Sequence, residues 1–205
     1  MMLPTHALVG LAIALPVSVA YPEFATPLLF SGLVGGVVPD FDMYFGHRKT
    51  LHFPVYYSVF ALGAIAVAVL VQTPWILAIT IAVVSAAVHS VMDIFGGGLE
   101  LRPWKATSEQ AVYDHVRKQW IAPRRWVRYD GAPEDLLLSL SVASPLLFVL
   151  DGRFFWVVVG ALAVSVGYVV LRRTLATVAE TLVEDFLKQL LPESLLPYLP
   201  ARYIR

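Results

Sequence analysis

The side chains best suited to chemistry in this chain are histidines and aspartates that border its apolar segments. Seven residues share this position: His6, Asp40, Asp42, His47, His52, His89 and Asp93. Imidazole and carboxylate groups together suit zinc, manganese or iron. Because the sequence contains no cysteine, a metal site would have to use these nitrogen and oxygen donors. An ionisable group in an apolar segment is costly unless it is paired, solvated or bound to a metal, so the set predicts metal binding.

Two pairs within this set have a spacing suited to chelation. His89 and Asp93 are four residues apart, so they lie on the same side of a helix. Asp40 and Asp42 would allow one carboxylate to bind a metal while the other orients a histidine or bridges a second metal. Each residue alone also fits a helix cap or an interfacial position, and His89 with Asp93 also fits a simple hydrogen-bonded pair. The shared depth of residues from separate segments favours metal binding.

The elements that carry these residues are predicted to be membrane-spanning helices. Of the 205 residues, 58% are hydrophobic and only 15% are charged, which leaves too little polar surface for a water-soluble globule. Six apolar segments can be marked: 5–21, 26–39, 52–71, 75–95, 135–150 and 154–171. The third and fourth are long enough to span a bilayer, whereas the first two are short and form either tilted spans or a re-entrant pair. The sequence therefore predicts an all-α, polytopic membrane bundle of about six spans.

The charge distribution predicts the orientation of this bundle. With six spans, Arg153 is the only one of the 15 Lys and Arg residues on its side of the membrane. Positively charged loops stay in the cytosol, so we expect a multi-pass protein of the cell membrane with both termini cytosolic. The first segment lacks a Lys/Arg-rich start and is interpreted as a retained helix rather than a signal peptide, with Thr5 as its N-cap.

The helix directions explain how the distant histidines and aspartates could meet. The first and third helices begin on the cytosolic side, and the second and fourth helices end there. The seven residues therefore fall at a similar depth near the cytosolic face, from four separate helices.

The remaining chain is predicted to lie at or outside the membrane. Residues 99–134 form a cytosolic loop that contains Trp104, Trp120 and Trp126, and residues 1–171 make one membrane-embedded domain with this loop included. Residues 172–205 are expected to form an amphipathic helix over 172–191 and a tail interrupted by prolines. The net charge is zero, so we expect no nucleic acid as a partner. The apolar segments make membrane lipid the expected partner.

The ordered motifs resemble the YdjM-like family of inner-membrane proteins, which are described as metal-dependent hydrolases. The resemblance covers residues 5–104 and rests on Thr5-His6-Ala7-Leu8-Val9-Gly10, Pro39-Asp40-Phe41-Asp42, His47-Arg48 with His52, and His89-x-x-x-Asp93 followed by Gly98 and Pro103. Two positions depart from the family pattern. Met43 stands where a further histidine is common, which removes one ligand, and Phe53 stands where a serine is common, which changes the pocket lining.

A more distant resemblance is to zinc-dependent phospholipase C and related nucleases. It implies one metal held by Asp40 or Asp42 with His52, His89 and Asp93, and a second metal near His6 that shares Asp93. Zinc is the expected metal and manganese the alternative. The later ligands of those enzymes have no clear match here, and His115 is the only later histidine.

The function implied is hydrolysis by metal-activated water, with a phosphodiester or another small phosphate-containing lipid substrate at the cytosolic interface. Asp42 and Arg48 are the candidate catalytic residues, since a guanidinium matches phosphate bidentately; Arg48 also fits an ordinary interfacial cation. Two other functions stay open. One is an ion-coupled transporter, because acids and histidines within membranes also build ion paths, and the other is a non-catalytic scaffold with a structural metal.

Overall fold

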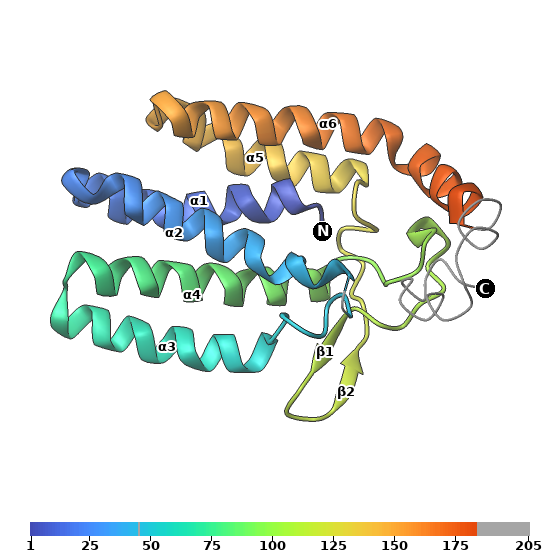
Figure 1. Ribbon diagram of the computed structural model, residues 1–205, viewed down its shortest axis with the longest axis horizontal. Helices are drawn as coiled ribbons and strands as arrows, with labels where there is room; N and C mark the ends of the chain where they lie inside the picture. Colours follow the sequence, from blue (N-terminus) through green and yellow to red (C-terminus); the bar gives the residue numbers. More distant parts are fainter. Residues whose placement is uncertain (45, 184–205) are drawn as a thin grey trace.

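The computed structural model describes residues 1–44 and 46–183 and has an all-α architecture with one short β-hairpin. The six α-helices form three antiparallel pairs: α1 (Leu3–Ala20) with α2 (Ala25–Val37), α3 (Pro54–Val71) with α4 (Pro74–Met92), and α5 (Pro133–Val149) with α6 (Gly152–Thr181). In Figure 1 the tight connections within the pairs lie at one end of the bundle, and the N-terminus and the longer connections gather at the other end. We call this second end the loop end.

The helix boundaries follow from prolines and turn residues in the sequence. Proline occupies the first turn of α1, α3, α4 and α5, where its missing N–H costs no hydrogen bond. α3 ends at Gln72 in the left-handed conformation, and the turn into α6 uses Gly152 at φ +50°, a value that glycine adopts without strain. Gly152 therefore makes the tight turn between α5 and α6.

The described helices have the length and surface of a membrane protein. Five stretches are long and apolar enough to cross a membrane: Leu3–Ala20, Pro22–Met43, Pro54–Val71, Pro74–Phe95 and Gly152–Thr181. Their outer faces carry apolar side chains such as Leu70 and Val170, which are 84% and 72% exposed. A surface of this kind needs a lipid environment. The apolar core lies between α1, α2, α4, α5 and α6, around Leu8, Leu28 and Leu146.

Two details differ from the sequence predictions. Thr5 does not cap α1, because the helix begins at Leu3 with Met2 as its N-cap residue. The last span does not end at 171: α6 continues to Thr181, so residues 172–181 extend this helix instead of starting a separate amphipathic one. The rest of the expected amphipathic helix and the proline-containing tail, residues 184–205, lie outside the described residues.

Glycines bring α1 and α2 into backbone contact. A Cβ atom at Gly10 would lie 2.1 Å from the carbonyl oxygen of Gly32, and a Cβ at Gly36 would lie 2.5 Å from that of His6. Small residues at such crossings let membrane helices approach closely. The start of α1 is therefore held directly against the last turn of α2.

The connections at the loop end fold back over the helices. At this end the short 3₁₀ helices η2 (Val38–Tyr44) and η3 (Asp93–Phe95) follow α2 and α4, and η4 (Pro103–Lys105) lies in the long loop; a further one, η1 (Pro22–Phe24), belongs to the tight connection between α1 and α2 at the opposite end. Strands β1 (Val112–Asp114) and β2 (Gln119–Ile121) pair antiparallel. The N–H of Tyr113 in β1 donates to the carbonyl oxygen of Arg48 at 2.9 Å, so the hairpin is joined to the linker between η2 and α3.

Gly36→Ala should destabilise the bundle, because the added methyl group would overlap the backbone of His6. Overpacking of this kind costs ~1–3 kcal/mol, and the thermal midpoint in detergent should fall accordingly. Gly160→Ala is the matched control, since a Cβ there has nothing within 4 Å and alanine favours a helix. Equal midpoints for the two variants would contradict the close α1–α2 packing.

Candidate metal centre

The two aspartates after α2 point to different sides because they lie on a 3₁₀ helix. With three residues per turn, residues two apart on η2 are separated by most of a turn. Asp40 faces α4, with Oδ1 3.5 Å from His89 Nε2. Asp42 faces the linker before α3, with Oδ2 2.9 Å from His52 Nδ1. The local backbone thus gives the two carboxylates separate partners.

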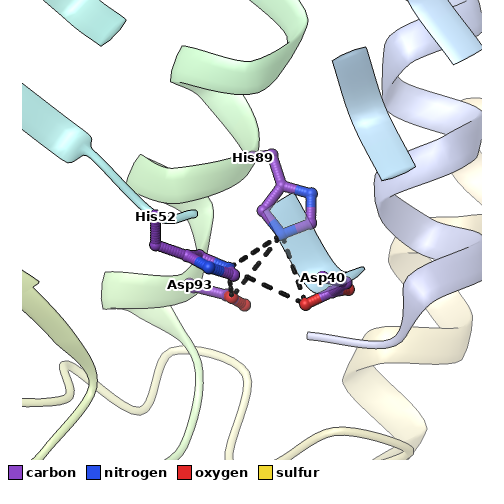
Figure 2. A group of neighbouring side chains, drawn as sticks. All are labelled: Asp40, His52, His89 and Asp93. Carbon is purple, nitrogen blue, oxygen red and sulfur yellow. Dashed lines mark hydrogen bonds and ion pairs between the residues drawn. The ribbon is translucent and has the colours of Figure 1, made fainter. Parts of the chain in front are cut away.

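Asp40, His52, His89 and Asp93 converge at the loop end, as the sequence predicted. His89 and Asp93 lie one turn apart at the end of α4, Asp40 comes from η2, and His52 comes from the linker before α3 (Figure 2). One ligand atom from each residue lies within 4.8 Å of the others, and all four residues are buried. We call these four residues the ligand cluster.

The distances within the ligand cluster suit a small cation. His52 Nε2 is 3.1 Å from His89 Nε2, 3.3 Å from Asp93 Oδ2 and 3.7 Å from Asp40 Oδ1. His89 Nε2 lies 3.8 Å from Asp93 Oδ2. Donor atoms on a tetrahedral zinc ion lie ~3.3–3.5 Å from one another, given bond lengths of ~2.0–2.2 Å. The cluster therefore has the donor types and spacing to hold a divalent metal.

The imidazole rings of His52 and His89 are oriented by hydrogen bonds at Nδ1, the ring nitrogen that points away from the centre of the ligand cluster. His89 Nδ1 donates to the carbonyl oxygen of Gly36 at 2.7 Å, and His52 Nδ1 lies 2.9 Å from Asp42 Oδ2. An imidazole that donates through Nδ1 presents Nε2 to a metal. Both Nε2 atoms face the centre of the cluster, so Asp42 orients a ligand instead of joining the cluster itself.

The centre of the cluster favours positive charge. Asp93 Oδ2 is buried and accepts no hydrogen bond from any residue that the structure describes. Burial lowers the pKa of His52, but its interactions with Asp42 and Asp93 outweigh burial and raise the pKa to about 9. Two facing Nε2 atoms would repel each other if both carried lone pairs, so a proton or a metal cation must lie between them. A divalent cation would take the place of the proton.

Arg48 contacts the cluster through Asp93. Its Nε lies 3.2 Å from Asp93 Oδ2, and Nη1 donates to the carbonyl oxygen of Gly97 at 2.8 Å. The residue is buried, and its backbone has φ +59°, a conformation that costs non-glycine residues ~1–3 kcal/mol. The N–H of Arg48 donates to Asp42 Oδ1 at 3.2 Å. The linker is therefore held in a strained form that aims the guanidinium at Asp93.

His6 lies beside the ligand cluster without belonging to it. His6 Nε2 is 3.1 Å from Asp93 Oδ1, which also contacts the amino group of Met1. The His6 ring stacks on the His89 ring with centroids 3.6 Å apart. The expected second metal would lie here, near His6 and shared by Asp93, but the described residues near His6 do not form a second cluster of three or more donors.

The two remaining histidines have other neighbours. His47 Nδ1 lies 3.1 Å from Asp42 Oδ1. His47 is therefore linked to the ligand cluster by hydrogen bonds through Asp42, which contacts His52. The His115 ring packs against Phe53 and Tyr113, with centroids 4.5 and 5.0 Å apart. Phe53, the departure noted in the sequence, thus contacts the hairpin.

Sequence reasoning missed Asp135, a buried carboxylate that anchors α1. It accepts hydrogen bonds from Thr5 Oγ1 at 2.7 Å, from the N–H of Met2 at 2.8 Å and from the N–H of Gly131 at 3.2 Å. Thr5 directly precedes His6, so this contact fixes the helix turn that carries the histidine. One feature of the sequence could have pointed to Asp135: it is an acidic residue at the start of an apolar segment. Such a residue is usually explained by its favourable interaction with the helix dipole alone.

A cavity of about 490 Å³ lies next to the ligand cluster. Asp40, His47 and Arg48 line it, together with the start of α1, the loop at 98–101, Asp130 and α6. Asp40 belongs both to the cavity wall and to the ligand cluster. A molecule in the cavity would therefore reach a metal-binding carboxylate.

Comparison with family models, with curated proteins and with solved structures found no match.

Asp42→Ala should weaken zinc binding ~10–100-fold, the usual cost of removing a group that orients a metal ligand. His89→Ala should weaken it further, because a ligand itself is lost. Affinity can be measured by competition with a chromophoric chelator on the purified full chain. His115→Ala is the control and should bind as the wild type does. Wild-type affinity in His89→Ala would show that the metal binds elsewhere.

Proposed function

We propose that this chain is a membrane-bound, metal-dependent hydrolase that acts on a phosphodiester or lipid phosphate. The observation that carries the proposal is the convergence of Asp40, His52, His89 and Asp93 beside a cavity that shares Asp40. Zinc is the preferred metal because two imidazoles and two carboxylates suit it, and manganese is the alternative. The resemblance to the YdjM-like family supports the same activity.

A bound divalent metal would supply a water of lowered pKa and neutralise charge on phosphoryl oxygens. The chain's own residues prepare the site for this chemistry. Asp42 holds the His52 ring in place through Nδ1, and Gly36 does the same for His89. Arg48 holds Asp93 in position through its Nε. Because Arg48 also lines the cavity, its positive charge favours a phosphate there.

The cavity favours a hydrolase over a scaffold with a structural metal. A structural site is closed on all sides by protein ligands, whereas a catalytic site keeps one side open. Asp40 lines the cavity, so one side of the ligand cluster borders open space. His52, His89 and Asp93 approach the cluster from other directions and are almost fully buried.

We further propose six spans, with α5 as the additional one, and a cytosolic loop end in the cell membrane. The charge bias supports this orientation, because among the described Lys and Arg residues only Arg153 lies at the end of the bundle with the tight connections. The ligand cluster would then lie near the cytosolic interface, where lipid phosphates are found.

The purified chain, loaded with zinc or manganese, should hydrolyse a chromogenic phosphodiester. Asp93→Asn should reduce the rate to background, because it removes a ligand charge. Arg48→Lys should keep its metal content but lose at least ~10-fold in rate, since an ammonium cannot reproduce the bidentate geometry of a guanidinium. Metal content and rate are measured on the same samples. Stoichiometric metal without hydrolysis of any phosphodiester would leave the scaffold as the correct function.

The orientation can be tested with single cysteines, because the chain contains none. Arg153→Cys and Lys118→Cys replace exposed residues at opposite ends of the bundle. In intact cells a membrane-impermeant maleimide should label the first variant and spare the second until the cells are lysed. The reverse labelling pattern would invert the proposed topology.

A further inference from the structure

His47 and Asp42 form a hydrogen-bonded pair that the ligand cluster does not require. His47 Nδ1 lies 3.1 Å from Asp42 Oδ1, while the other oxygen of the same carboxylate, Oδ2, lies 2.9 Å from His52 Nδ1. The Asp42 carboxylate therefore holds two imidazole rings. Only one of its oxygens is needed to orient His52, so the contact with His47 needs a separate explanation.

The contact with Asp42 determines which ring nitrogen of His47 carries a proton. The buried carboxylate also accepts the backbone N–H groups of Arg48 and Leu51, and an ionised carboxylate can only accept. His47 must then donate through Nδ1, and in a neutral imidazole this leaves a lone pair on Nε2. Imidazole is mostly neutral at pH 7 even in water, and burial lowers the pKa of His47 further. Asp42 thus holds His47 as a proton acceptor at Nε2.

The accepting nitrogen of His47 lies on the side of the cavity. His47 lines the cavity, and 19% of its side chain is exposed, whereas the Asp42 side chain is fully buried. Nδ1 faces this buried carboxylate, so Nε2, on the other side of the ring, is the nitrogen that faces the cavity. Asp40 lines the same cavity and belongs to the ligand cluster. The lone pair of His47 therefore borders the open side of the cluster.

Among the described side chains that line the cavity, a histidine is best suited to take up a proton near neutral pH. The carboxylates in the wall outside the ligand cluster have other partners. Asp130 accepts hydrogen bonds from Arg172, and Glu100 accepts the backbone N–H groups of residues 107 and 108. Arginine side chains keep their protons. His47 is therefore the cavity residue best placed to exchange a proton with a molecule at the open side of the cluster.

We propose that His47 is the general base of this site and that Asp42 positions it. The inference rests on the proposed hydrolase function, which supplies the reaction. His47 Nε2 takes a proton from the attacking water as the water oxygen forms a bond to phosphorus. The ester P–O bond to the leaving group breaks, and the leaving oxygen takes a proton from solvent. The imidazolium of His47 then returns its proton to solvent, so one water is consumed for each ester bond cleaved.

The protonation of each ring nitrogen of His47 can be measured without any reaction, by nitrogen NMR of the full chain with isotope-labelled histidine. The resonances that are missing in His47→Gln identify His47. We expect a protonated Nδ1 and a bare Nε2. Asp42→Ala should shift the proton toward Nε2, because the acceptor at Nδ1 is lost. A proton on Nε2 in the neutral ring of the wild type would overturn the proposal.

Chemical rescue tests proton transfer directly. His47→Ala should keep wild-type zinc affinity, because His47 is outside the ligand cluster, but should lose ~100–10,000-fold in the rate of phosphodiester hydrolysis. Added imidazole should restore part of this rate from the cavity, and more basic imidazoles should restore more. His47→Gln should stay as slow as His47→Ala, since an amide can hydrogen-bond Asp42 but cannot take the proton. His115→Ala is the matched control and should keep the wild-type rate, with no stimulation by imidazole.

Three results would overturn the base while leaving the hydrolase in place. One is a wild-type rate in His47→Ala or His47→Gln, and another is loss of zinc from His47→Ala, because His47 would then be a metal ligand. The third is a rescue that grows as the added imidazole becomes less basic, which is the behaviour of an acid. A wild-type chain that binds zinc and hydrolyses no phosphodiester would overturn the hydrolase itself, and the base with it.

Discussion

The buried carboxylate of Asp93 is the group on which the loop end of this protein depends. It is 1% exposed and meets His6, Arg48 and His52 from three different segments. A carboxylate out of water is costly unless positive charge or hydrogen-bond donors surround it. Each segment that reaches Asp93 therefore brings part of this compensation, and together they fix where the helix ends must meet.

The helices bring Asp40, His89 and Asp93 to the same end of the bundle, and the linker between η2 and α3 completes the ligand cluster with His52. This linker is fastened on several sides: Asp42 accepts the backbone N–H groups of Arg48 and Leu51, and the β-hairpin donates through Tyr113. The loop end is thus a folded layer with its own hydrogen bonds. It covers the side chains of the ligand cluster without adding a long helix.

Much of the fold could be predicted because apolar runs bounded by prolines and glycines predict membrane helices directly. The ligand cluster could be predicted because few side chains bind metals and few ionisable groups occur in apolar segments. The separate roles of Asp40 and Asp42 could not, because they depend on the 3₁₀ geometry of η2. The sequence left Arg48 as either an interfacial cation or a phosphate contact. Its contact with Asp93 could not be predicted, because nothing in the sequence indicates its positive φ.

Contacts between residues far apart in the sequence could not be predicted either. Arg172 was expected to lie beyond the last span because it is charged. The α6 helix nevertheless continues past it to Thr181, and Asp130, far from it in sequence, forms an ion pair with it. Asp135 likewise gave no sign of its partner, since Thr5 lies 130 residues earlier. Periodicity and composition are local properties, and they do not predict such pairings.

The contact between Asp135 and Thr5 also has a consequence for biosynthesis. Translation delivers the N-terminal part of a protein first, so all four residues of the ligand cluster are made before α5 exists. Until Asp135 arrives, Thr5 and the N–H of Met2 lack the acceptor that fixes the turn before His6. The turn that carries His6 is therefore complete only after α5 has been made, although α5 contributes no residue to the ligand cluster.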